Sequence, residues 1–155
     1  MLDALRRHAA RFAGYTELRW QTNRGQRIGM RRGTLLTNTS GRSSGVSARC
    51  WRDGVFGFAA RPDGDDATIA RVLADAADNA DLKGTGTGRA GGPLPDAGAG
   101  SGAYDYRTAR PTLSPAERID IVRRLDAYVG ERYPGLVNFD VALNTLSMEK
   151  ALVTS

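Results

Sequence analysis

The sequence of 155 residues, 41% of them hydrophobic, is long enough for one domain with a sizeable core and short for two. The net charge of +5 and the pI near 9.9 invite a nucleic-acid interface, but the basic residues are almost all arginines spread along the chain. With one cysteine, Cys50, and one histidine, His8, the chain cannot assemble an intrachain disulfide or a Cys/His zinc site.

The N-terminal segment predicts an amphipathic helix over 2–12, because Leu2, Leu5, Ala9 and Phe12 lie three or four residues apart. Arginines interrupt its apolar residues, unlike the apolar region of a signal peptide, and no run of the chain is long and apolar enough to span a membrane. We therefore expect a cytoplasmic protein with no membrane partner. His8 is expected at the surface or boundary of this helix rather than as a ligand, since the chain offers no partner residue for a site.

From residue 15 to residue 60 the apolar period changes to two, which predicts strands. Glycine-bearing turns at 23–25, 31–33, 40–45 and 53–54 predict an antiparallel meander, and the Asp-Gly pair at 53–54 is a strong hairpin signal. Its strands would be about 15–22, 26–30, 34–39, 46–51 and 55–60. Alternation places Val46, Ala48 and Cys50 on one face, so Cys50 is interpreted as a small core residue.

A helix follows, capped by Asp65 or Asp66, with an apolar stripe that continues to Ala80. Residues 83–112 are then rich in glycine and proline, which predicts a flexible loop of about thirty residues. This loop contains GTGRAG at 86–91, which matches G-x-G-x-x-G. No strand precedes it and no helix follows for some twenty residues, so a nucleotide site is not expected there.

The C-terminal part predicts one more helix and a hairpin. Ser114, Pro115 and Glu117 form a capping-box pattern that begins a helix reaching about Arg132. Strict alternation predicts a strand over 137–144, with 148–155 as its hairpin partner. Because the chain ends within this predicted strand, we expect that Ser155 is not the natural end of the protein.

These elements predict a single α+β domain over 1–155, with an antiparallel or mixed β-sheet meander and amphipathic helices packed on one face. The stretch GRSSGVSARCWRDGVFGFAARPDGDDATIARVLADAADNA resembles the N-terminal domain of the TldD/PmbA family, the so-called modulators of DNA gyrase, which are related to zinc metallopeptidases. The residues that carry the resemblance, interpreted as structural, are Gly45, Val46, Arg49, Gly57, Phe58 and Ala59. Arg49 lies beside Trp51 on the face opposite Cys50, where it could stack or pair.

The resemblance implies a two-part protein that forms a homodimer or heterodimer with a TldD/PmbA-type subunit and cleaves extended peptides. The family's zinc motif, HExxxH, lies in its C-terminal catalytic domain, and this sequence does not contain that motif. We therefore expect no catalytic, cofactor-binding or metal-binding residue in this chain, with zinc only in the family's C-terminal domain. The predicted function is assembly of the dimer and of a peptide-binding cavity. The alternative is a free-standing basic module that binds nucleic acid.

Overall fold

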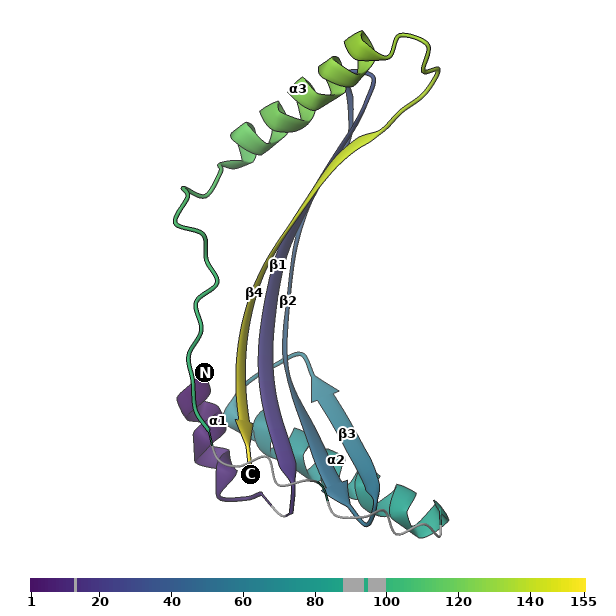
Figure 1. Ribbon diagram of the computed structural model, residues 1–155. Coiled ribbons are helices and arrows are strands. Elements are labelled where there is room, and N and C mark those ends of the chain that lie inside the picture. The colour runs from purple at the N-terminus through teal and green to yellow at the C-terminus, as the bar shows by residue number, and fades with distance from the viewer. Residues whose placement is uncertain (13, 88–93, 95–99) are drawn as a thin grey trace. The chain divides into compact units, whose positions relative to one another are not determined.

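The computed structural model describes residues 1–12, 14–87, 94 and 100–155, and it has the predicted α+β class (Figure 1). Four strands form one antiparallel sheet in the order β3-β2-β1-β4. The elements are α1 (Leu2–Ala9), β1 (Thr16–Arg31), β2 (Thr34–Arg52), β3 (Val55–Arg61), α2 (Asp66–Thr87), α3 (Pro115–Arg132) and β4 (Val141–Thr154). Within the described residues, no helix is long and apolar enough to cross a membrane.

Two of the predicted turns connect the first three strands. Arg32 and Gly33 join β1 to β2 with φ values of 45° and 81°, and Asp53 and Gly54 join β2 to β3 with 47° and 86°. Two successive residues with positive φ are the requirement of a type I′ turn, whose twist matches the flanking strands. The hairpin predictions at these two positions are confirmed.

The other two predicted turns, at 23–25 and 40–45, are wrong. β1 and β2 run through them as single strands of 16 and 19 residues. Neither Gly25 nor Gly41 has a positive φ. Glycine adopts an extended backbone as readily as a turn conformation, so its presence does not require a turn. The predicted meander of five short strands is therefore two long strands followed by β3.

The contacts divide the described chain into two compact units, each considered by itself. Unit 1 comprises Met1–Asn23, Arg42–Ala97 and Met148–Ser155. Its helices α1 and α2 pack on the sheet face that carries Val46, Ala48 and Cys50, as predicted for Cys50. The buried core of this unit consists of Leu5, Leu18, Val46, Ala48, Cys50, Ile69, Val72, Leu73 and Ala76.

The ends of the two helices in unit 1 differ from the predicted ends. α1 stops at Ala9, three residues before the predicted Phe12, and Gly14 follows it with a φ of 65°. Asp65 caps α2, because its side chain accepts hydrogen bonds from the backbone N–H and hydroxyl of Thr68. α2 continues to Thr87, so the predicted loop does not begin at residue 83. Of the remaining loop, residues 88–93 and 95–99 lie outside the described residues.

Unit 2 comprises Arg24–Gly41 and Gly98–Ser147. The predicted capping box is present: Ser114 Oγ accepts from the Glu117 N–H, and the Glu117 carboxylate accepts from the Ser114 N–H. α3 ends at Arg132, as predicted. The helix buries Val122 against Ile28 and Met30 of β1, and Ile119, Val141 and Leu143 pack around them.

The C-terminal hairpin prediction is wrong, because residues 141–154 form one strand, β4, rather than two. The predicted strand start at Val137 also fails. Residues 137–140 are not in a strand, and their polar contacts are made to the β1–β2 turn region instead: Asp140 pairs with Arg31, and the Val137 carbonyl accepts from Arg32. The end of β4 returns to unit 1, where the Ser155 N–H donates to the Thr16 carbonyl at 3.0 Å.

Candidate functional site

The residues of the family-like motif meet where β2 pairs with β3. This antiparallel pairing places Arg49 opposite Phe58, Cys50 opposite Gly57 and Trp51 opposite Phe56. Because side chains alternate along a strand, Arg49, Trp51, Phe56 and Phe58 share the sheet face opposite to the buried Cys50. We call this the outer face of unit 1.

The two motif glycines lie where neighbouring backbone leaves no room for a side chain. A Cβ on Gly57 would come within 2.0 Å of the Ala76 carbonyl oxygen and 2.3 Å of the Ala80 nitrogen, both in α2. A Cβ on Gly45 would come within 2.5 Å of the Arg61 carbonyl oxygen in β3. Gly57 thus lets α2 lie directly on the edge strand β3, and this close packing fixes the hairpin that presents the outer face.

Arg49 is held in place by a carboxylate from the neighbouring strand. Its guanidinium forms a short ion pair with Oε1 of Glu17 in β1, and Tyr15 donates its hydroxyl to the same oxygen at 2.7 Å. Its Cζ atom lies 4.4 Å from the ring centroid of Phe56. Arg49 therefore both pairs and stacks, but its partners are Glu17 and Phe56 rather than the adjacent Trp51.

Aromatic rings surround this ion pair. The rings of Trp51 and Phe56 lie 4.6 Å apart, and Tyr15 meets Phe56 edge-on at 6.4 Å. Phe58, the next outward residue of β3, is 56% exposed. A surface that combines aromatic side chains with a positioned arginine is typical of binding sites.

The ion pair changes the pKa values of its members. Partial burial raises the pKa of Glu17, but hydrogen bonds from Arg49 and Tyr15 outweigh it, so the pKa lies below its ordinary value. The hydrogen bond that Tyr15 donates to Glu17 raises the pKa of Tyr15, and the hydrogen bond that Arg49 donates to Glu17 raises the pKa of the Arg49 guanidinium. Glu17 is therefore ionised and Tyr15 protonated at neutral pH.

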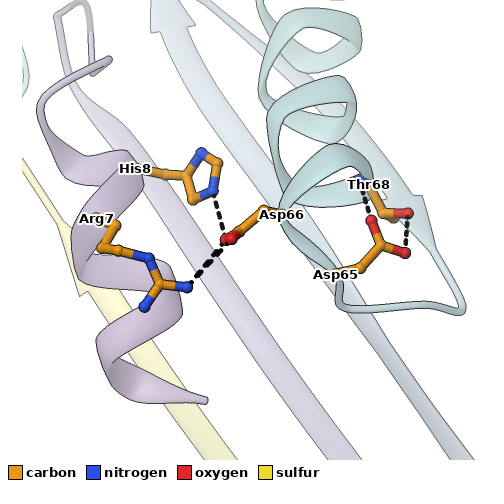
Figure 2. A network of polar contacts seen from close by, with 5 residues as sticks. All are labelled: Arg7, His8, Asp65, Asp66 and Thr68. Atoms are coloured by element: carbon orange, nitrogen blue, oxygen red, sulfur yellow. Dashed lines mark hydrogen bonds and ion pairs between the residues drawn. The ribbon is translucent and has the colours of Figure 1, made fainter.

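The prediction that His8 lies at the surface or boundary of the first helix is wrong, because the side chain is buried against the start of α2. His8 is only 5% exposed, and its Nε2 lies 3.1 Å from Oδ1 of Asp66 at the start of α2 (Figure 2). Arg7 also donates to both oxygens of Asp66, at 3.1 and 3.2 Å. Together these contacts lower the pKa of Asp66, chiefly through the hydrogen bond with His8. This network ties α1 to α2 and is structural.

Other candidate chemistry is not brought together in the described part of the chain. Among those residues, no group of three or more His, Cys, Asp or Glu side chains could hold a metal ion. Cys50 is buried, where its sulfur accepts from the Thr16 hydroxyl at 3.7 Å. Of the GTGRAG segment, Gly86 and Thr87 belong to α2, and residues 88–91 lie outside the described residues.

The sequence interpretation found Arg49 but missed Glu17, Tyr15 and Phe56. An alternating pattern assigns faces within one strand, whereas these partners come from β1, its preceding loop and β3. The register between strands decides which of their residues meet. The Asp53-Gly54 turn was the one signal available, because a two-residue turn fixes the β2–β3 register and so places Phe56 opposite Trp51.

Comparison with known proteins gives a family match for part of the chain and a similar fold for nearly all of it. Residues 16–80 match PmbA/TldA metallopeptidase domain 1. TldE from Thermococcus kodakarensis has a similar structure, with a TM-score of 0.68 and 14% identity over 99% of this chain and 34% of that chain. No curated protein sequence matches this chain.

Two further solved structures share the fold. A protein described as a modulator of a DNA gyrase from Thermotoga maritima has a TM-score of 0.63 and 14% identity, and one from Bacteroides thetaiotaomicron has 0.61 and 8%. Each alignment covers 99% of this chain and 34% of the other. The chain thus spans about a third of the length of the structures it resembles.

Proposed function

We propose that the chain, whose residues 16–80 match PmbA/TldA metallopeptidase domain 1, is a non-catalytic domain that holds extended peptides. The observation that carries this proposal is the Arg49 cluster on the outer face of unit 1, next to the edge strand β3. On that strand the Phe58 carbonyl already accepts a hydrogen bond from Asn79 Nδ2 at 3.0 Å. The metal-dependent step of a family metallopeptidase would belong to residues outside this chain, since the chain has one histidine and no HExxxH.

The edge strand supports the peptide-binding part of the proposal. β3 is the last strand of the sheet, so one side of its backbone has no strand partner. An extended peptide can add to such an edge through main-chain hydrogen bonds, which read backbone rather than sequence. Its alternate side chains would then lie beside Phe58 and beside Phe56, on whose ring the paired Arg49 stacks.

The ion pairing of the arginines argues against the nucleic-acid alternative. A phosphate-binding surface needs guanidinium groups that are free of carboxylates. In unit 1 and unit 2 alike, arginines already contact acidic side chains: Arg31 with Asp140, Arg49 with Glu17, Arg52 with Asp81, Arg61 with Asp75, and Arg107 with Asp105. The net charge is therefore interpreted as a general surface property.

The proposal extends to assembly and location. Domains of this family are expected to act in a dimer with a second TldD/PmbA-type subunit, and we place the chain in the cytoplasm, where a single buried cysteine stays reduced. Native mass spectrometry of the chain, alone and mixed with a TldD-type subunit, tests the assembly. A chain that stays monomeric in both samples contradicts it.

The experiment that tests peptide binding uses a permanently unfolded probe, reduced and carboxymethylated lactalbumin, titrated against the full chain. We expect Phe58→Ala to weaken binding at least fivefold, because Phe58 is an exposed anchor beside the β3 edge. Leu36→Ala is the matched control, since Leu36 is similarly exposed at 53% but lies in unit 2. No binding by the wild-type chain, or equal losses in both variants, would overturn the proposal.

A further inference from the structure

Unit 2 contains a pocket that the peptide-binding proposal does not use. It has a volume of about 300 Å³ and lies between the β1–β2 turn, α3 and the segment that follows α3. Its lining includes Arg32, Gly33, Asp126, Tyr133, Leu136 and Phe139. Pockets for drug-sized ligands span roughly 300–1,000 Å³, so this one suits a small molecule.

Asp126 gives the pocket an unbalanced charge. Its side chain is buried, with 4% of the residue exposed, and Oδ2 accepts the Gly33 N–H at 2.6 Å. Oδ1 is also buried, and no hydrogen-bond partner for it exists among the described residues. A buried carboxylate oxygen without a partner is costly, and native proteins retain one where a ligand, ion or partner satisfies it.

The two arginines of the lining do not supply that partner. Arg123 pairs with Asp120, and Arg32 donates to the Val137 carbonyl at 2.9 Å. A guanidinium carries five N–H donors, so Arg32 can also bind a carboxylate that enters the pocket. The pocket thus offers a negative group and a positive group that do not neutralise one another by direct contact.

Apolar side chains form the rest of the wall. Tyr133 is 52% exposed and Leu136 is 44% exposed, and Phe139 lines the pocket with them. A ligand with an apolar side chain would remove this surface from water, which is favourable. The complete lining therefore has one acidic, one basic and one apolar part.

We propose that this pocket binds a small zwitterion with an apolar side chain, such as a leucine-sized α-amino acid. The ammonium group lies on the Asp126 side, the carboxylate pairs with Arg32, and the side chain packs against Tyr133, Leu136 and Phe139. This site involves none of the residues of the peptide-binding proposal. Each of the two can therefore fail without the other.

Isothermal titration of the full chain with L-leucine tests the site. We expect L-leucinamide, which lacks the carboxylate, and 4-methylpentanoate, which lacks the ammonium, each to bind at least tenfold more weakly. Equal binding of leucinamide would mean that a peptide N-terminus satisfies the site, and it would overturn the role of Arg32. Equal binding of 4-methylpentanoate would overturn the role of Asp126, and no leucine binding at millimolar concentration would overturn the whole proposal.

Two variants test the roles proposed for Asp126 and Arg32. Asp126→Asn removes the carboxylate and keeps an acceptor for Gly33. Arg32→Asn removes the guanidinium and suits the positive φ at that position, and it also removes the donor to the Val137 carbonyl. Both should weaken leucine binding at least tenfold. The matched control is Glu131→Gln, an exposed residue of α3 outside the pocket lining, which should leave it unchanged.

A measurement on the wild-type chain covers the case in which Asp126→Asn fails to fold. The Gly33 N–H donates to Asp126, so its amide NMR signal should shift on addition of L-leucine and follow the same binding curve as the heat. An unchanged Gly33 signal at saturating leucine would overturn the assignment of the ammonium group to Asp126.

Discussion

Nε2 of His8 in α1 lies 3.1 Å from Oδ1 of Asp66 in α2, although 58 residues separate them in the sequence. The hydrogen bond with His8, together with those from Arg7, holds the pKa of Asp66 below its ordinary value. A carboxylate whose pKa is lower in the folded state stabilises the fold above its unfolded-state pKa, and that contribution is lost as the pH falls through the folded-state pKa.

Asp66→Asn should therefore make the free energy of unfolding depend less on pH in the acidic range. We expect the difference in free energy of unfolding between wild type and Asp66→Asn to shrink as the pH falls below about 5. Urea unfolding at a series of pH values measures this. Asp63→Asn serves as the control, since Asp63 is an exposed residue that precedes α2. A difference that grows toward low pH would contradict the linkage.

Gly57→Ala should destabilise unit 1. The added Cβ would lie 2.0 Å from the Ala76 carbonyl oxygen and 2.8 Å from the Ala80 Cα, so α2 must move away from β3. Overpacking of this kind costs about 1–3 kcal/mol or more, which thermal or urea unfolding can resolve.

The control for that variant is Gly41→Ala. Gly41 also lies in a strand, β2, but a Cβ there meets nothing within 4 Å. Its unfolding midpoint should stay within error of the wild type or rise slightly, because alanine restricts the unfolded chain. Equal effects of the two substitutions would show that the close approach at Gly57 is not the cause.

Local signals predicted α2, α3 and two of the turns. The capping box at Ser114 and the positive-φ pair at Asp53-Gly54 act over three or four residues, so the sequence alone contains them. The turns predicted within β1 and β2 are wrong, because whether a strand continues there depends on pairing with distant segments. Turn-like composition at 40–45 permits a turn without requiring one, and pairing with neighbouring strands extends the strand through it.

The candidate sites depend on contacts between distant segments, and for that reason the sequence predicted them only in part. Arg49 meets Glu17 across 32 residues, and Gly33 meets Asp126 across 93. The contact between His8 and Asp66 was not predicted, because the acidic residues at the start of α2 were assigned to helix capping. In the structure Asp65 caps the helix, which leaves Asp66 free to pair.

Ser114→Ala should weaken α3 and, with it, unit 2. The substitution removes the acceptor for the Glu117 N–H, and loss of such a cap costs about 0.5–2 kcal/mol. Ser114→Asp retains an acceptor at the same position and should recover most of the loss. Hydrogen exchange of the α3 amides locates the effect, and faster exchange confined to α1 or α2 would contradict it.

Arg49→Ala tests the electrostatics of the outer face. Burial favours the neutral form of Glu17, and the hydrogen bond from Arg49 is the main influence that opposes it. Without Arg49, the pKa of Glu17 should rise, which a ¹³C NMR titration of its side-chain carboxyl can follow. The fold itself should persist, because Arg49 is partly exposed and lies outside the buried core.

Arg49→Lys separates charge from geometry. A lysine retains the positive charge but not the planar group that pairs with Glu17 while lying 4.4 Å from the centre of the Phe56 ring. We therefore expect Arg49→Lys to raise the pKa of Glu17 less than Arg49→Ala does, yet to bind carboxymethylated lactalbumin as weakly as Arg49→Ala. Wild-type peptide affinity in Arg49→Lys would show that the charge alone suffices, and an unshifted Glu17 in Arg49→Ala would show that the ion pair does not control its ionisation.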